Sequence, residues 1–379
     1  MNFTYLPNQV FVEREVAHSV IAQKVLRTLS GVPVHLIDSV EHLRRRAKKL
    51  SPTIAVGKKT LVLARHRGSF FKYCPASQTR GGKTNVCCNY FVVNFASNCH
   101  MECSYCYLQS YLNFPYMLVY ANLEDLFAEI KAVLSGSPQS FFRIGTGELA
   151  DSLALDPLTG YAQKLVKFFS EFQNAVLELK TKTDCVKGLL SLKHRGKTVV
   201  SWSMNTPFIQ KTEEHKTASV KHRLIGAQQC VDAGYKVGFH FDPLIYYPDW
   251  EKDYHALVNQ IFDRLPSEAI AWFSIGGLRM SPQLKEKMRS RFPNSFLPLG
   301  ELVPSADGKL RYLKQIRTKM YLKMLEWLRE RSSPSTGIYA CMERPEVWSR
   351  LFGSSPLTDV EIGDQVTSGL QSNKFQSET

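Results

Sequence analysis

The sequence has no long hydrophobic run and no apolar leader-like segment. None of its stretches approaches the about 18 consecutive apolar residues of a membrane-spanning helix. It also lacks the cysteine pattern of a disulfide scaffold, because its nine cysteines include three that are grouped at the spacing of metal ligands. We therefore expect a cytoplasmic protein that does not enter a membrane.

Acidic residues are scarce relative to basic ones. The 379 residues include 34 acidic and 48 basic side chains, which gives a formal net charge of +14. Such a surface attracts polyanions, and DNA or another nucleic acid is the expected partner. The basic residues are spread along the chain, with groups at 44–49, 211–223, 285–291 and 309–331. Because charge alone gives affinity without sequence readout, solvated helix faces are an equal alternative to a binding groove.

A loop with three cysteines lacks the fourth ligand of a closed metal site. Cys99, Cys103 and Cys106 are separated by three and then two residues. Structural zinc sites and fully protein-ligated iron–sulfur clusters take four protein ligands, whereas a cubane held by three cysteines leaves one iron free to bind a reactant. The alternatives are a zinc site with a distant fourth ligand, or buried free cysteines. The spacing and the tyrosine before the third cysteine favour the cluster.

From residue 89 the pattern alternates between short β-branched or aromatic runs and amphipathic segments of helical length, which predicts repeated βα units on a parallel sheet. The 44% hydrophobic content is sufficient for a sizeable core. Strands are expected over Tyr90–Phe95, Phe141–Gly145, Ala175–Thr181, Thr198–Met204, Lys236–Phe241 and Ile270–Ile275. Helices are expected over Leu123–Leu134, Gly160–Phe172, Val220–Ala233, Asp253–Leu265, Pro282–Arg291 and Leu310–Arg331.

Six βα units fit an α/β fold of the partial (β/α)6 barrel type, with small extensions at both ends. We expect an N-terminal α/β layer over residues 1–85, the barrel over 86–300, a basic helical region over 301–362 and a disordered tail over 363–379. In α/β barrels, functional residues gather where the strands end at their C-terminal edge.

The expected strand ends carry polar residues. The second ends in Gly145-Thr146-Gly147-Glu148, where glycines allow close approach of a ligand and Glu148 offers a carboxylate to an amino group. Lys182 follows the third strand and is a plausible partner for a carboxylate or a phosphate. Ser201, Ser203 and Asn205 alternate along the fourth strand and so share one face.

Two further positions have competing interpretations. His240 and Asp242 share a face of the fifth strand, where a core histidine paired with a carboxylate is favoured over a substrate or proton-relay role. Cys185 lies just past the third strand, where it could act as a hydrogen donor, although an inert buried thiol is the favoured interpretation.

The pattern C-x-x-x-C-x-aromatic-C at residues 99–106 resembles the signature of the radical S-adenosylmethionine enzymes. This resemblance implies a partial barrel with a [4Fe–4S] cluster held by Cys99, Cys103 and Cys106. It also implies S-adenosyl-L-methionine as a cofactor that is cleaved to a 5′-deoxyadenosyl radical, and a reductant such as flavodoxin or ferredoxin. The segment Gly145–Glu148 resembles the one that receives the cofactor's amino group in that superfamily.

Within that superfamily the chain resembles the spore photoproduct lyase family. The similarity rests on residues 98–109, the Lys182 segment, 193–198, 233–235, and Trp250 with Tyr254. It implies a lyase that reverses a thymine-dimer lesion in DNA. The implied cofactor-binding residues are Tyr105, Gly147, Glu148, Lys182, Ser203 and Asn205. Tyr105 and Tyr107 are the tyrosines expected near the chemistry, and stacking on the cofactor adenine is an equal alternative for Tyr105.

The chain departs from the family pattern at the hydrogen donor. An ungapped comparison places Glu148 at the position of the donor cysteine and Ala150 at that of a cofactor-binding serine. A carboxylate cannot donate a hydrogen atom as a thiol does, so Cys185 or another thiol takes over, or the reaction differs. The segment 311–317 also lacks the tryptophan and glycine of the family's basic region. The alternative functions are a radical enzyme acting on RNA, protein or a small molecule, and a cluster-containing nucleic-acid-binding protein. The oligomeric state is left open.

Overall fold

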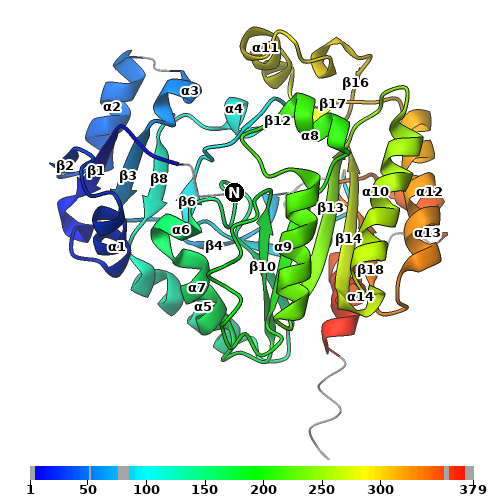
Figure 1. Cartoon of the computed structure of the whole chain (residues 1–379), viewed down its shortest axis with the longest axis horizontal. Helices are drawn as coiled ribbons and strands as arrows, with labels where there is room; N and C mark the ends of the chain where they lie inside the picture. The colour runs from blue at the N-terminus through cyan, green and yellow to red at the C-terminus, as the bar shows by residue number, and fades with distance from the viewer. Residues whose placement is uncertain (1–4, 51–52, 76–84, 354–357, 372–379) are drawn as a thin grey trace, which may run out of the picture.

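The protein is represented by a computed structural model that describes residues 5–50, 53–75, 85–353 and 358–371. Two sheets dominate it, a smaller one formed largely by the N-terminal part of the chain and a larger, curled one beside it (Figure 1). Among the helices of the described residues, none combines the length and the apolar character that crossing a membrane requires.

The larger sheet is a partial barrel. Its order is β18-β14-β13-β11-β10-β9-β5-β4, in which β4 is antiparallel to β5 and every other neighbouring pair is parallel. An isolated bridge between Val86 and Glu343 joins the segments that flank the two ends of this sheet. The strands are β4 (Phe71–Tyr73), β5 (Tyr90–Val93), β9 (Phe142–Gly145), β10 (Ala175–Thr181), β11 (Thr198–Ser203), β13 (Lys236–Leu244), β14 (Ile270–Gly277) and β18 (Gly337–Ala340).

Helices cover the outside of the barrel sheet and connect its strands (Figure 1). Three of them begin at residues whose hydroxyl groups accept a backbone N–H of the first turn, Thr206 before α8, Ser219 before α9 and Ser281 before α11. The helices of this part are α4 (Leu108–Tyr111), α5 (Leu123–Gly136), α6 (Asp156–Thr159), α7 (Tyr161–Phe169), α8 (Pro207–Glu213), α9 (Val220–Asp232), α10 (Trp250–Arg264), α11 (Pro282–Arg291), α12 (Lys314–Arg331), α13 (Pro345–Phe352) and α14 (Asp359–Gln371).

The smaller sheet has the order β2-β1-β3-β8-β6. Its elements are β1 (Gln9–Glu13), α1 (Val20–Thr28), β2 (Val34–Ile37), α2 (Val40–Leu50), α3 (Ile54–Gly57), β3 (Thr60–Ala64), β6 (Ala96–Ser97) and β8 (Met117–Tyr120). The chain crosses the boundary expected near residue 85 in both directions, because β6 and β8 complete this sheet while β4 joins the barrel. The two sheets therefore share one continuous core.

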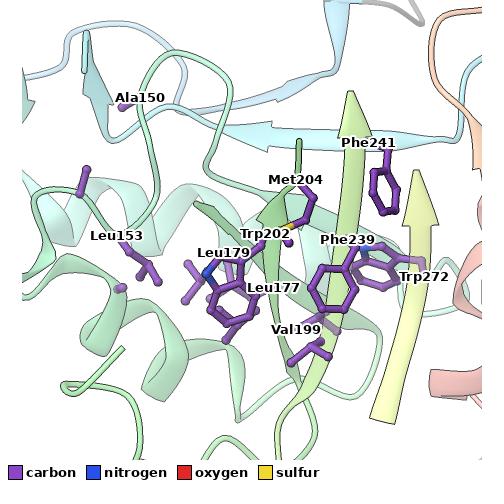
Figure 2. Packing of buried hydrophobic residues seen from close by; sticks show 14 of the residues in the cluster. Ala150, Leu153, Leu177, Leu179, Val199, Trp202, Met204, Phe239, Phe241 and Trp272 are labelled. Atoms are coloured by element: carbon purple, nitrogen blue, oxygen red, sulfur yellow. The ribbon is translucent and has the colours of Figure 1, made fainter. Parts of the chain in front are cut away.

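Alternation along the barrel strands separates an apolar outer face from a polar interior. Figure 2 shows buried apolar side chains of this core, among them Leu177, Leu179 and Trp202. The intervening residues face the interior, where Glu178 accepts hydrogen bonds from Ser201 and from Trp272. The barrel interior is thus built from polar groups that bond to one another, and the hydrophobic core lies between the sheet and its helices.

The six expected strands and the five helices expected between and after them are confirmed, with ends shifted by a few residues. The C-terminal region differs more. The helix expected from Leu310 begins at Lys314, because residues 310–311 form β17. The segment at Gly337 supplies β18, a further parallel strand that pairs with β14.

The prediction of a disordered tail from residue 363 is wrong for residues 363–371. They belong to α14, whose Ile362 and Val366 are buried, and Val366 packs directly on Gly337 of β18. Residues 372–379 of the expected tail lie outside the described residues. Because α14 is mostly polar in composition, its few apolar side chains that pack on the barrel do not stand out in the sequence.

Candidate active site

The cysteine loop lies between β6 and α4, at the end of the first parallel barrel strand. Asn98, at a φ of 77°, starts the loop and donates to the carbonyl oxygen of Pro115 at 2.8 Å. Gln109 holds its far end by donating to the carbonyl oxygen of Ser104 at 2.7 Å. Within the loop, β7 (Glu102–Cys103) pairs with β12 (Glu214–His215), so that Cys103 stands opposite Glu214. The loop is therefore tied to segments on both sides.

All three cysteines of this loop are free thiols. Cys103 is buried, and burial raises the pKa of the Cys99 thiol to about 12. Burial also raises the pKa of Cys103. Cys99 and Cys106 add to this shift, and the positive charge of Lys182 opposes it. Lys58 and Lys182 also oppose the effect of burial on the pKa of Cys106, so the positive charges near this loop would favour a negatively charged cluster held by its thiolates.

The donor set fits a cluster better than a single ion. Within the described part of the chain, no three histidine, cysteine, aspartate or glutamate side chains are placed to hold one metal ion. Zinc ligands must converge on a single point, whereas a cubane places each cysteine on a different iron. Cys99, Cys103 and Cys106, close together in sequence on one loop, suit the second requirement and are the residues that would hold such a cluster.

Tyr105 is the centre of a buried polar network next to this loop. Its hydroxyl group donates to Glu214 and accepts from Lys182 Nζ at 3.1 Å and from Asn205 Nδ2 at 3.2 Å. Lys182 and Asn205 also donate to Glu214 Oε1, each at 3.0 Å. Tyr254 donates in turn to Asn205 Oδ1 at 2.6 Å. The structure thus brings together three of the predicted cofactor-binding residues.

Glu214 carries the negative charge of the network. Burial raises its pKa, but Arg223 and Lys182 more than compensate and hold that pKa far below its usual range. Arg223 Nη2 lies 2.5 Å from Glu214 Oε2, and Arg223 Nη1 donates to the carbonyl oxygen of Ser203 at 2.8 Å. Ser203 thereby connects the network to the end of β11. Glu214, Arg223 and Tyr254 were not among the predicted site residues.

The loop after β9 approaches the cysteine loop from the other side. The Glu148 carboxylate accepts from Asn94 Nδ2 at 2.9 Å, and the Glu148 carbonyl oxygen accepts from the Tyr107 hydroxyl group. Gly145 has no room for a side chain, because a Cβ there would lie 1.5 Å from the Tyr90 hydroxyl oxygen. Tyr107 and Glu148 are thus in direct contact. The neighbouring Gly147 packs against the Lys180 side chain.

Asp151 fixes this loop to the end of β10. Its carboxylate accepts from the backbone N–H groups of Lys182 at 2.8 Å and of Leu153 and Ala154, and from the Thr181 hydroxyl group at 2.7 Å. Burial nevertheless raises the pKa of Asp151 above its ordinary value. The backbone of Lys182 is consequently placed by Asp151, while its ammonium group is placed by Glu214.

The floor of the barrel interior is a second buried network. Glu178 accepts from Arg143 Nη2 at 2.9 Å and from His240 Nε2 at 2.6 Å. Arg143 also donates to the Tyr339 hydroxyl group at 2.7 Å. The favoured interpretation of His240 as a core histidine paired with a carboxylate agrees with this geometry, and the carboxylate is Glu178. Asp242, on the same face of β13, instead accepts from Arg279 at 2.9 and 3.0 Å.

Cys185 lies outside both networks. Its backbone N–H donates to Thr183 Oγ1 at 3.2 Å, and its partly buried thiol packs against the core. Burial is the main cause of the raised pKa of Tyr107, and Cys74, just after β4, is among the groups that add to this shift.

Spore photoproduct lyase is the family whose model matches this chain, over residues 5–324. A spore photoproduct lyase of Clostridium acetobutylicum is 27% identical over 246 residues, which are 65% of this chain and 70% of that protein. One of a Geobacillus species is 26% identical over 303 residues, 78% of this chain and 86% of that protein.

Solved structures of spore photoproduct lyase have the same fold. A variant with bound AdoMet and dinucleoside spore photoproduct superposes with a TM-score of 0.76 and 23% identity, covering 88% of this chain and 98% of the other. A complex with dinucleoside spore photoproduct alone gives a TM-score of 0.75. Because the family match spans most of the sequence, this chain is an enzyme of the spore photoproduct lyase family, within the radical S-adenosylmethionine superfamily.

Proposed function

We propose that the chain holds a [4Fe–4S] cluster through Cys99, Cys103 and Cys106, binds S-adenosyl-L-methionine, and reverses a thymine-dimer lesion in DNA. The observation that carries this proposal is the contact between the three-thiol loop and the network of Tyr105, Lys182 and Asn205 at the barrel's strand ends. Its relatives are named spore photoproduct lyases, which supports the proposal. A solved structure of a spore photoproduct lyase variant holds AdoMet together with dinucleoside spore photoproduct. When bound, cluster and cofactor supply a 5′-deoxyadenosyl radical.

The cofactor site uses residues on both sides of the cysteine loop. Lys182 offers an ammonium group to the cofactor's carboxylate, and its place is set by hydrogen bonds to Tyr105 and Glu214. Gly147 would contact the cofactor through its backbone, with the Lys180 side chain 3.2 Å from the place where a Cβ would lie. The Glu148 carboxylate, oriented by Asn94, accepts from the cofactor's amino group. Ser203 and Asn205 complete the site at the end of β11, with Tyr105 beside them.

Tyr105, Tyr107 and a thiol are the residues proposed to act after hydrogen abstraction. Tyr107 reaches the Glu148 position through its hydroxyl group, so it lies where the donor cysteine of the family is expected. Cys185 is the proposed donor, and Cys74 is the alternative because it is among the groups that raise the pKa of Tyr107. Either thiol would return one hydrogen atom to the repaired base.

A different substrate is the second candidate function, and the carboxylate of Glu148 favours it. Because this carboxylate occupies the expected donor position, a radical enzyme acting on RNA, protein or a small molecule would share the cofactor site but not the final step. A nucleic-acid-binding protein with a structural or redox-sensing cluster is a third candidate. We favour DNA because a net charge of +14 suits phosphate binding during extrusion of a damaged base.

These assignments also imply an electron donor, a cellular location and a surface for nucleic acid. We propose that a reductant such as flavodoxin or ferredoxin supplies the electron and that the protein acts in the cytoplasm. Basic side chains on α11 and α12 are exposed, among them Arg289 and Lys319, each of which also lies 3.5 Å from a carboxylate, that of Glu286 or of Glu251.

The decisive experiment is anaerobic reconstitution with iron, sulfide, reductant and S-adenosyl-L-methionine, with and without DNA that contains the lesion. We expect 5′-deoxyadenosine together with repaired thymines. Deoxyadenosine without repair would favour another substrate for the same chemistry. No deoxyadenosine at full cluster occupancy would favour the binding protein and overturn the proposed lyase function.

A further inference from the structure

Glu102 lies in the cysteine loop between Cys99 and Cys103, and its carboxylate is held by two basic side chains. Lys58 Nζ lies 3.4 Å from Glu102 Oε1, and Arg291 Nη2 lies 2.6 Å from Glu102 Oε2. The side chains of Lys58, Glu102 and Arg291 are only 10%, 12% and 19% exposed, so water screens these contacts weakly. The loop is therefore fixed at Glu102 by one cation on each carboxylate oxygen.

Lys58 reaches the loop from the smaller sheet. It directly follows α3, which packs tightly on Pro115, since a Cβ at Gly57 would lie 2.4 Å from the Pro115 carbonyl oxygen. Besides its ion pair with Glu102, Lys58 Nζ donates to the carbonyl oxygen of Met101. This ammonium group thus bonds to the backbone of one loop residue and to the side chain of the next.

Arg291 reaches the loop from the other flank, as the last residue of α11. Its Nη1 donates to the side-chain oxygen of Gln109, the residue whose amide nitrogen holds the far end of the loop. Lys287, one turn earlier on α11, donates to the Gln109 carbonyl oxygen at 2.5 Å. Arg291 therefore bonds to Glu102 and to Gln109, on either side of the second and third cysteines of the loop.

The charges of this group favour a negatively charged cofactor. Lys58 and Arg291 carry two positive charges against the one negative charge of Glu102, which leaves a net charge of +1 beside the loop. A cluster bound by thiolates is negatively charged, and its reduction adds an electron, so its potential depends on neighbouring charges and hydrogen bonds. Lys58 and Arg291 can therefore affect both the geometry of the loop and the reduction of a cluster bound to it.

We propose that Lys58 and Arg291 are positioning residues for the [4Fe–4S] cluster and act through Glu102 and the ends of the cysteine loop. From opposite flanks they hold the loop in the form in which its three thiolates bind the cluster. The inference rests on the proposed function, because it concerns the cofactor of that site. It gives α11 a role in the cofactor site, although α11 and the cysteine motif are far apart in the sequence.

The first test measures how fast the anaerobically reconstituted protein loses iron to a chelator. We expect Lys58→Gln and Arg291→Gln each to lose iron about 10-fold faster or more, because groups that orient metal ligands typically contribute that much to metal binding. Glu102→Gln, which removes the charge shared by both cations, should have a similar effect. Combining Lys58→Gln with Glu102→Gln should give less than the product of the two single effects, because the same contact is broken in each.

The second test measures the reduction potential of the retained cluster and its electron paramagnetic resonance spectrum in the reduced state. Lys58→Gln should shift the potential to more negative values, because the loss of a positive charge disfavours the added electron. Lys58→Arg, which keeps the charge, should restore most of the parent value. A spectrum and a potential unchanged in Lys58→Gln would overturn the inference, because faster loss of iron would then reflect lower protein stability alone.

Controls separate this inference from misfolding and from the proposed function. Lys59→Gln changes the neighbouring exposed lysine, and Arg289→Gln changes an exposed arginine of α11 that pairs with Glu286 at 3.5 Å. Both should retain iron as the parent does. Circular dichroism before reconstitution identifies a variant that does not fold, in which case Glu102→Gln, close in shape to the parent, decides the test. Rates of iron loss equal to those of the controls would overturn the inference and leave the proposed function intact. A parent protein that holds no [4Fe–4S] cluster would overturn both.

Discussion

Arg223 and Glu214 form an ion pair from which water is excluded. Arg223 Nη2 lies 2.5 Å from Glu214 Oε2, and both side chains are fully buried. Arg223 occupies one carboxylate oxygen, which leaves Oε1 to receive Lys182, Asn205 and Tyr105. The pair therefore connects α9 to the network and sets the position of the three side chains that bond to Oε1.

Removing one member of this pair should be costly. Arg223→Ala leaves a buried carboxylate without its main partner, so we expect the free energy of unfolding to fall by about 3–5 kcal/mol. Urea denaturation followed by circular dichroism measures the change. Lys319→Ala is the control, since Lys319 and Glu251 form an exposed pair at 3.5 Å and such pairs contribute at most about 1 kcal/mol. Similar losses in both variants would contradict the assignment.

The cysteine loop can be tested by its iron content. Replacing Cys99, Cys103 or Cys106 with alanine should each lower bound iron after anaerobic reconstitution and abolish cleavage of S-adenosyl-L-methionine, because a cubane with two protein thiols is poorly held. Cys230→Ala provides a matched control, as Cys230 is a free cysteine buried in α9. Full iron content and activity in any one loop variant would show that the ligand set is wrong.

The hydrogen donor can be identified by paired thiol substitutions. If Cys185 returns the hydrogen atom, Cys185→Ala should keep cofactor cleavage but yield less repaired thymine and more by-products. The same profile in Cys74→Ala would assign the role to Cys74. Product analysis by mass spectrometry distinguishes the two. An unchanged product profile in both single variants would exclude each as the donor.

The buried histidine of the barrel floor predicts a pH dependence of stability. Burial lowers the pKa of His240 below its ordinary value of 6.5, although Glu178 partly opposes this shift. As the pH falls below 6.5, the unfolded chain binds a proton that the folded protein does not, so stability present above this value is lost. His240→Gln should reduce the slope of the free energy of unfolding against pH by at most about 1.4 kcal/mol per pH unit. The exposed His42 supplies a control substitution, and an unchanged slope in His240→Gln would refute the prediction.

The C-terminal helix should contribute to the stability of the barrel. Truncation before Asp359 removes the buried side chains of Ile362 and Val366, and we expect a loss of about 3 kcal/mol or more from their burial. Thermal unfolding of the truncated and full chains measures it. Truncation after residue 371 removes residues outside the described part and serves as the comparison. An unchanged midpoint in the shorter chain would contradict the docking of α14.

The elements that the sequence predicts well have strong local patterns. The six strands are runs of β-branched and aromatic residues, and the helices between them have apolar residues at helical spacing. β18 is four residues long and begins with glycine, so its role as a barrel strand depends on pairing with β14. In α14, two glycines and several polar residues oppose helix formation, and packing on β18 and β14 decides its structure.

The same distinction between local pattern and tertiary pairing applies to the residues of the candidate site. Tyr105, Lys182 and Asn205 could be predicted because they lie beside the cysteine motif or at strand ends. Glu214 could not, because its role depends on the pairing of β12 with β7, which joins segments more than a hundred residues apart. Arg223 lies among the buried residues of α9, and a buried arginine has no local signature that distinguishes it from a surface one.

The bridge between Val86 and Glu343 has a consequence for biogenesis. Because it joins an early and a late part of the polypeptide, together with the hydrogen bond from the Cys87 N–H to Asp359, the barrel cannot close until the ribosome has released most of the chain. Such non-local contacts slow folding and leave strand edges open in the nascent protein. Chaperone dependence during synthesis is therefore expected to be greatest before residues 337–371 emerge.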